Sequence, residues 1–183
     1  AALLPRRTGP RQFNSVDGAG QPFGNVSSAG NGNWEMQVIF QTDPASTANY
    51  GAAVGTANSG GTFRTNDANL IRFDSTATAC TGTGNNVTAN WVYETITGGV
   101  ATCVDSGVAV AASTWYWAHL KSVAGAVSMR IGTAPSAITQ ATVAVGNSTT
   151  AGQGPVFQVL THTTATKKLL VDKYAAQITG LTR

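Results

Sequence analysis

Apolar and polar residues alternate along several segments of this chain, and a period of two is the spacing of a β-strand with one buried face. Residues 34–41 give the clearest early case. Every second side chain there is apolar and falls on one face: Trp34, Met36, Val38 and Phe40. We therefore predict a half-buried strand at this position.

The same pattern recurs at short intervals down the chain. Further strands are predicted over residues 50–54, 70–74, 91–95, 100–104, 115–123, 127–131, 142–145, 155–162 and 169–177. Turn residues separate them, among them Gly98-Gly99, which is typical of a hairpin. No segment shows a convincing helical period of 3.6 residues. About ten short strands joined by turns predict an all-β fold, an antiparallel β-sandwich of the jelly-roll kind.

Residues 1–30 lack this periodicity and contain several glycines and prolines. We predict an extended N-terminal arm there, followed by one β-sandwich domain over residues 31–183. The arm carries Arg6, Arg7 and Arg11, which supply the net charge of +3. A basic arm can anchor to acidic neighbours or act as a solubilising tail. Because the rest of the chain is nearly neutral, nucleic-acid binding is not expected.

The composition favours strands over helices. The chain of 183 residues holds two Glu and four Lys but 26 Thr, and only 10% of its residues are charged. Exposed helix faces are usually built from Glu and Lys, whereas Thr favours strands. A hydrophobic content of 42% with a net charge of +3 also disfavours disorder.

Two sequence features bear on the compartment. No run of about 18 apolar residues is present, so no membrane-spanning helix is predicted, and the first residues lack a signal-peptide pattern. Cys80 and Cys103 flank a segment that we interpret as two strands and a turn. A cross-strand disulfide is one interpretation and two buried free thiols are the other. A disulfide would indicate an extracellular setting.

A motif in the middle of the chain resembles a known family. Residues 105–116 read DSGVAVAASTWY, and two later strands read VSMRI (127–131) and LLVDKY (169–174). This order of motifs resembles the concanavalin A-like (laminin G-like) sandwich domain of tailed-bacteriophage virion proteins, over residues 30–183. One departure is Ile131-Gly132-Thr133, where the family usually has an Ile-Asn-Gly turn.

The resemblance implies a bacteriophage virion structural protein on the particle surface, as a tail-fibre, spike or capsid-decoration subunit. Its partners would be other virion proteins and further copies of itself, with a homotrimer favoured, and the arm would anchor it. One alternative is a glycan-binding lectin or receptor-binding domain that adheres to a host-surface glycan. A second is a polysaccharide depolymerase. A third, a jelly-roll coat with a basic arm, is disfavoured because three Arg are few for packaging a genome.

Residues suited to catalysis are scarce. Glycosidases need two carboxyl groups about 5–9.5 Å apart. The two Glu residues, Glu35 and Glu94, lie on strands far apart in sequence, and we interpret both as solvent-facing. The strand-borne Gln, His and Tyr set of jelly-roll lyases has no match, and no Gly-x-Ser-x-Gly motif is present. We therefore predict a non-enzymatic protein with no cofactor. Because calcium needs clustered carboxylates, no metal site is predicted either.

The predicted strand over residues 115–123 carries the best candidate contact residues. Its alternation directs Tyr116, Ala118 and Leu120 inward, and it directs Trp117, His119 and Lys121 outward. An exposed Trp is usually covered by something, because isolated apolar surface is unfavourable in water. Three interpretations of Trp117 stay open: a subunit contact, a platform for a glycan, and a partly covered surface residue.

Overall fold

The computed structural model describes residues 33–57, 67–76, 83–84, 89–147, 154–164 and 166–179. Within these residues the chain forms eleven strands and one short 3-10 helix, η1 (Pro135–Ile138). The predicted arm at residues 1–30, with Arg6, Arg7 and Arg11, lies outside the described residues, as does Cys80. The division into arm and domain therefore stays a prediction.

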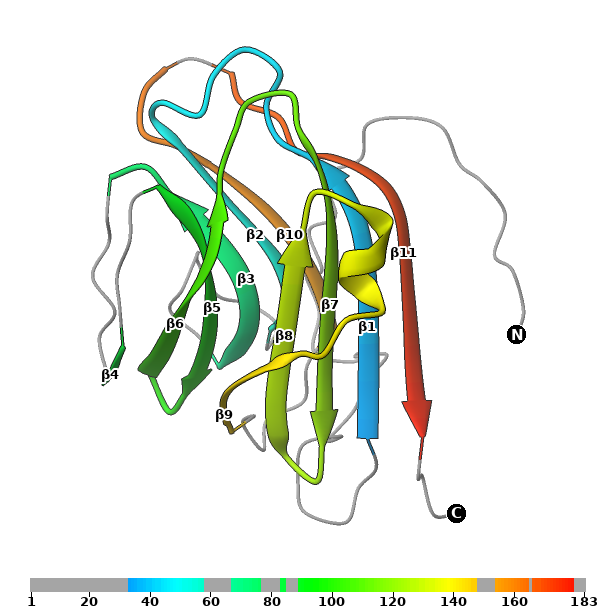
Figure 1. Cartoon of the computed structure of the whole chain (residues 1–183). Helices are drawn as coiled ribbons and strands as arrows, with labels where there is room; N and C mark the ends of the chain where they lie inside the picture. The colour runs from blue at the N-terminus through cyan, green and yellow to red at the C-terminus, as the bar shows by residue number, and fades with distance from the viewer. Residues whose placement is uncertain are drawn as a thin grey trace.

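The strands form two sheets that pack face to face as a sandwich (Figure 1). Sheet A has five strands in the order β11 (Leu170–Thr179), β1 (Asn33–Gln41), β7 (Trp115–Val123), β8 (Ala126–Gly132) and β9 (Val143–Asn147). Sheet B has six in the order β10 (Gly154–Thr161), β2 (Tyr50–Ala57), β3 (Ala68–Asp74), β5 (Asn90–Thr97), β6 (Val100–Ala109) and β4 (Thr83–Gly84). Apart from the short parallel pair β4–β6, all paired strands are antiparallel. The all-β, antiparallel sandwich prediction is confirmed.

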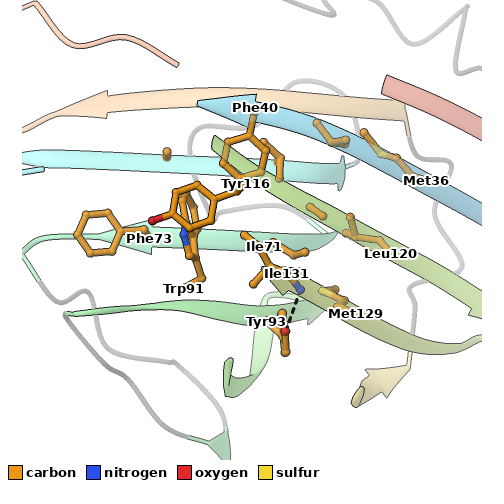
Figure 2. Close-up of a cluster of buried hydrophobic side chains, with 14 of the residues drawn as sticks. Met36, Phe40, Ile71, Phe73, Trp91, Tyr93, Tyr116, Leu120, Met129 and Ile131 are labelled. Atoms are coloured by element: carbon orange, nitrogen blue, oxygen red, sulfur yellow. Dashed lines mark hydrogen bonds between the residues drawn. The ribbon is translucent and has the colours of Figure 1, made fainter. Parts of the chain in front are cut away.

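The main core lies between the two sheets and follows the alternation of the sequence. In β1 every second residue is buried, and the same is true of Tyr116 and Ala118 in β7. Aromatic rings fill the centre: the Trp91 ring lies edge-on to Phe40 and to Tyr116, with ring centroids 5.3 Å apart in both pairs (Figure 2). Such edge-to-face pairs contribute about 0.5–1.5 kcal/mol beyond the burial of their area.

A hydrogen bond joins the two sheets through this core. The backbone N–H of Ile131 in β8 donates to the hydroxyl oxygen of Tyr93 in β5, at 3.1 Å (Figure 2). The pairing of β8 with β9 includes Met129 but does not reach Ile131. Tyr93 therefore supplies a partner to a buried N–H that the neighbouring strand leaves open, and burial raises the pKa of its phenol.

Sheet B is also apolar on its second face, away from sheet A. A smaller cluster there includes Leu70, Val92 and Ile96. Because both faces are covered, β3 is buried at every position. The expectation that Glu94 faces solvent is wrong: Glu94 is fully buried on this second face, where its Oε2 accepts a hydrogen bond of 2.8 Å from Nε of the equally buried Arg72.

The motif that carried the family resemblance forms the end of β6 and the turn into β7. The hydroxyl of Tyr116 fixes that turn, because it accepts a hydrogen bond from the N–H of Ala111 (2.8 Å) and donates one to the carbonyl of Ala109 (2.9 Å). At the start of the motif, Asp105 accepts a hydrogen bond from the N–H of Gly107, whose φ of +69° suits glycine. The structure thus gives the motif a local folding role.

No helix among the described residues is long and apolar enough to cross a membrane.

Candidate functional site

The outer face of sheet A, which points away from sheet B, carries the contact residues predicted from the sequence. Trp117, His119 and Lys121 all project there from β7, while Tyr116, Ala118 and Leu120 lie in the core. The predicted orientation of these six side chains is therefore confirmed. Trp117 and Lys121 are half-buried, whereas His119 is only 8% exposed. Their role as contact residues stays a prediction.

The strand register brings further polar residues beside them. Gln37 of β1 and Arg130 of β8 lie directly opposite His119, one on each side, and Glu35 lies opposite Lys121. Cross-strand partners share a face of the sheet, so these side chains form one surface. We call it the outer patch and define it as Glu35, Gln37, Trp117, His119, Lys121 and Arg130.

Gln37 and Arg130 are not among the contact residues predicted from the sequence, although their positions carry a signal. Both occupy polar positions within the alternating strands: Gln37 lies between Met36 and Val38, and Arg130 between Met129 and Ile131. Their alternation alone predicts that they point away from the core. What it does not predict is the strand order, which sets them on either side of His119.

Glu35 and His119 lie in direct contact in the outer patch. Nε2 of His119 lies 3.0 Å from Oε1 of Glu35, and the side-chain amide of Gln37 donates to the same oxygen at 3.0 Å. The separation is within hydrogen-bond distance but the contact does not have the geometry of a hydrogen bond, and among the described residues neither buried ring nitrogen of His119 has a hydrogen-bond partner. Buried polar atoms usually have a partner, so an ordered water molecule or a polar group of a ligand can complete the hydrogen bonding here.

Arg130 also has unused hydrogen-bonding capacity. Its Nη2 donates to the side-chain oxygen of Gln140 at 2.6 Å, while its buried Nε has no hydrogen-bond partner among the described residues. A guanidinium has five N–H donors, so this one hydrogen bond leaves most of them unassigned. Gln140 lies in the connection between η1 and β9. Through the hydrogen bond to Arg130, this connection contacts the edge of the outer patch.

The helix η1 borders the patch beside Trp117. It packs against β7 and β8 on the outer face of sheet A (Figure 1). The cross-strand partner of Trp117 is Gly132, where an added Cβ would lie 2.8 Å from Cβ of Ala137 in η1. The missing side chain of Gly132 thus lets the helix approach the sheet, and η1 and Trp117 stand side by side at one end of the patch.

A second cluster containing a histidine lies at the end of β3 and β10. Nε2 of His162 is 2.8 Å from Oδ1 of Asp74 and 3.2 Å from the hydroxyl of Thr76. In a hydrolase triad the carboxylate and the nucleophile contact different ring nitrogens. Here both contact Nε2, so the cluster ties together the ends of two strands and does not resemble a triad.

The described residues contain no group of three or more His, Cys, Asp or Glu side chains placed to hold a metal ion. Cys103 takes part in a disulfide in the structure. Its expected partner, Cys80, lies outside the described residues, so the pairing of the two stays a prediction.

Comparison with solved structures shows the fold of this chain in other proteins. A protein of unknown function from Shewanella oneidensis superposes with a TM-score of 0.56 at 15% identity, covering 87% of this chain and 63% of that protein. Alginate lyase A1-II', a member of polysaccharide lyase family 7, superposes with a TM-score of 0.50 at 9% identity, covering 86% of this chain and 66% of the lyase. The carbohydrate-binding module CBM66 from Bacillus subtilis gives 0.48 at 7% identity, covering 80% of this chain and 76% of that module.

The first two likenesses lie below 25% identity and show the fold alone. The chain spans slightly less than two thirds of the first two of these structures. No protein-family model and no curated protein matches the sequence. None of the three structures is described as a phage protein, so the phage part of the resemblance stays a prediction.

The comparisons do correct one expectation. The prediction of a non-enzymatic protein is wrong, because a structure with this fold is a polysaccharide lyase. The scarcity of paired carboxylates in the sequence argued against one class of glycosidase and did not bear on other enzymes that use this sandwich.

Proposed function

We propose that the protein binds a polysaccharide through the outer patch of sheet A. The observation that carries the proposal is the half-buried Trp117 beside a row of polar side chains, Gln37, His119 and Arg130, which the strand register aligns across the sheet. An indole ring presents a broad apolar face, and neighbouring donors and acceptors can bind hydroxyl groups.

The fold supports the same proposal. A sandwich that recurs in an alginate lyase is a scaffold on which a polysaccharide can be held against a sheet. Of the interpretations open for Trp117, we therefore prefer a glycan platform to a subunit contact. The second interpretation predicts oligomers that dissociate when Trp117 is replaced, which native mass spectrometry measures directly.

The test is binding to a glycan array and to polysaccharides in affinity electrophoresis. Trp117→Ala is expected to weaken binding by about tenfold or more, as is usual for a central aromatic contact. Tyr174→Ala is the matched control, because Tyr174 is an exposed aromatic residue on β11 outside the outer patch. Retained binding by Trp117→Ala, or equal losses in both variants, would place the binding site elsewhere.

Cleavage of the bound polysaccharide at the same patch is a second candidate function. It is favoured by the 3.0 Å contact between His119 and Glu35, because histidine is the most common general acid or base in enzymes. A glycosidase with paired carboxylates is not favoured, since Glu35 is the one carboxylate of the outer patch. Product release from polysaccharides, measured as new chain ends, tests this. His119→Ala should abolish release while Trp117 still supports binding.

A place on the surface of a phage particle is also proposed, from the sequence resemblance. In that setting the polysaccharide would belong to the host cell surface, and the basic arm would attach the domain to other virion proteins. Native mass spectrometry should then show a homotrimer. Deletion of residues 1–24 should abolish incorporation into particles, and unchanged incorporation would contradict the anchoring role of the arm.

A further inference from the structure

The outer patch carries positive charge that its own residues do not fully engage. Arg130 and Lys121 lie on the neighbouring strands β8 and β7, with His119 directly opposite Arg130 and Lys121 two residues further along β7. Side chains at such diagonal positions start about 7–8 Å apart, which is within reach of long residues. Two cationic groups can thus approach one point on the surface.

The one carboxylate of the patch does not neutralise them. Oε1 of Glu35 accepts a hydrogen bond from Gln37 and lies against His119. The ion pairs found among the described residues do not include Lys121 or Arg130. Arg130 instead bonds to the neutral amide of Gln140, and within the part of the chain that the structure describes its Nε has no hydrogen-bond partner.

We propose that the outer patch recognises acidic polysaccharides, with the carboxylate of a uronic acid residue bound by Arg130 and Lys121. This inference rests on the proposed function. Arg130 provides the geometry, because a planar guanidinium can donate two parallel hydrogen bonds to one carboxylate. Trp117, one row along the sheet, contacts the face of the same or the adjoining sugar ring. The amide of Gln140 holds Arg130 in place through its present hydrogen bond.

Arg130 should bind an acidic ligand better than a neutral one. A ligand that covers Arg130 takes a cation out of water, and the hydroxyl groups of a neutral sugar offer acceptors but no countercharge to offset that cost. A carboxylate supplies both the countercharge and the acceptors. Because the patch is at the surface, the charge contribution should also weaken as salt screens it.

The experiment compares polysaccharides that differ only in charge. Polygalacturonate is paired with its methyl ester, and carboxymethyl cellulose with hydroxyethyl cellulose. Affinity electrophoresis and calorimetry measure binding of the wild type, Arg130→Met, Arg130→Lys and Trp117→Ala. Lys173→Met serves as the charge-matched control, because Lys173 is an exposed cation on the same face of sheet A but outside the outer patch, on β11, with β1 between it and β7. Circular dichroism checks that each variant is folded.

The wild type is expected to bind the acidic member of at least one pair about tenfold or more tightly than its neutral partner. Arg130→Met should remove this preference, Arg130→Lys should restore part of it, and Lys173→Met should leave it unchanged. Equal binding of acidic and neutral partners that still depends on Trp117 would overturn the inference and leave the proposed function standing. Acidic preference that survives Arg130→Met, or that Lys173→Met removes equally, would also overturn it. If neither pair and no array glycan binds, the proposed function itself fails.

Discussion

Arg72 and Glu94 form an ion pair inside an apolar part of sheet B. Both residues are at most 1% exposed, and the Nε–Oε2 distance is 2.8 Å. Taking two charges out of water is costly, and their mutual attraction offsets that cost only while both partners are present. The pair also contacts Cys103, whose Sγ lies 3.4 Å from Oε1 of Glu94.

Removing one partner should therefore be more damaging than removing an exposed charge. Glu94→Ala is expected to lower the free energy of unfolding by about 3–5 kcal/mol, because it leaves the Arg72 guanidinium buried without its carboxylate. Urea titration followed by fluorescence measures this. Glu35→Ala, on the outer face, should cost less than about 1 kcal/mol. Similar losses in the two variants would contradict the burial of the Glu94 charge.

The carboxylate of Asp43 helps to hold the connection between β1 and β2 against the segment that precedes β11, and a hydrogen bond of 3.2 Å from Nζ of Lys167 to the carbonyl of Ser46 joins the same two segments. The carboxylate of Asp43 accepts hydrogen bonds from the N–H groups of Ala45 (2.8 Å), Ser46 (3.3 Å) and Lys168 (2.7 Å). Burial by itself raises the pKa of Asp43, but these three donors and the nearby charge of Lys167 outweigh it and hold the pKa below the usual 3.8.

A lowered pKa in the folded state makes the protein acid-sensitive at this point. The stabilisation from Asp43 is complete above its ordinary pKa and is lost as the pH falls through the lowered value in the folded protein. Asp43→Asn should lose about 1–3 kcal/mol at pH 7, because the side-chain amide keeps one acceptor oxygen and its NH2 group cannot accept the hydrogen bonds made to the other carboxylate oxygen. The gap between wild type and variant should narrow as the pH drops from about 5 to about 2. A gap that is constant with pH would argue against this role.

Close approach of β2 to β3 depends on a glycine. Gly55 has φ of +155°, and a Cβ added there would lie 2.0 Å from the backbone oxygen of Asn69. Backbone cannot move aside as a flexible side chain can, so the strands would have to separate.

Gly55→Ala is therefore expected to destabilise the protein by several kcal/mol, measured as a fall in the thermal midpoint. Gly99→Ala is the matched control, because Gly99 in the β5–β6 hairpin also has positive φ (+79°) but has nothing within 4 Å of the added Cβ. It should cost only about 1 kcal/mol. Equal costs would mean that the contact between β2 and β3 is looser than described.

The amino-acid sequence predicts the bounds and buried face of some strands better than those of others. Strand β7 runs over residues 115–123, as its alternation predicts, because one of its faces meets the core and the other meets solvent. In β5 both faces are covered, so a polar residue can be buried on either face. The polar character of Glu94 therefore leads to the wrong prediction that its side chain faces solvent. The two-residue strand β4 is too short to produce any pattern.

The candidate site could be predicted in part for a related reason. The direction in which a side chain points from one strand depends on the local alternation of that strand, so the outward orientation of Trp117, His119 and Lys121 can be predicted from the sequence. The neighbours of a strand depend on topology, and β1 precedes β7 by more than seventy residues in sequence. The contact of Glu35 with His119 and the alignment of Arg130 therefore require the folded chain.

At the scale of the whole molecule, the state of the cysteines bears on stability, because the disulfide-bonded Cys103 is buried in the cluster on the second face of sheet B. Non-reducing peptide mapping should recover Cys80 and Cys103 in one disulfide-linked fragment. Reduction, or Cys103→Ser, should lower stability by about 2–4 kcal/mol, as is typical for a disulfide. Recovery of both cysteines as free thiols, under conditions that prevent reduction, would contradict the pairing.

The two sheets differ in how many of their side chains are exposed. Strands β2 and β3 present almost no exposed positions, whereas most outer positions of β1, β7 and β8 can change without loss of core packing; Gly132, on which η1 packs, is an exception. Sequence divergence should consequently accumulate on one side of the molecule. New ligand preferences can arise there through one or two substitutions, while the buried sheet preserves the ability to fold. A library that randomises only the outer positions of sheet A would exploit this division.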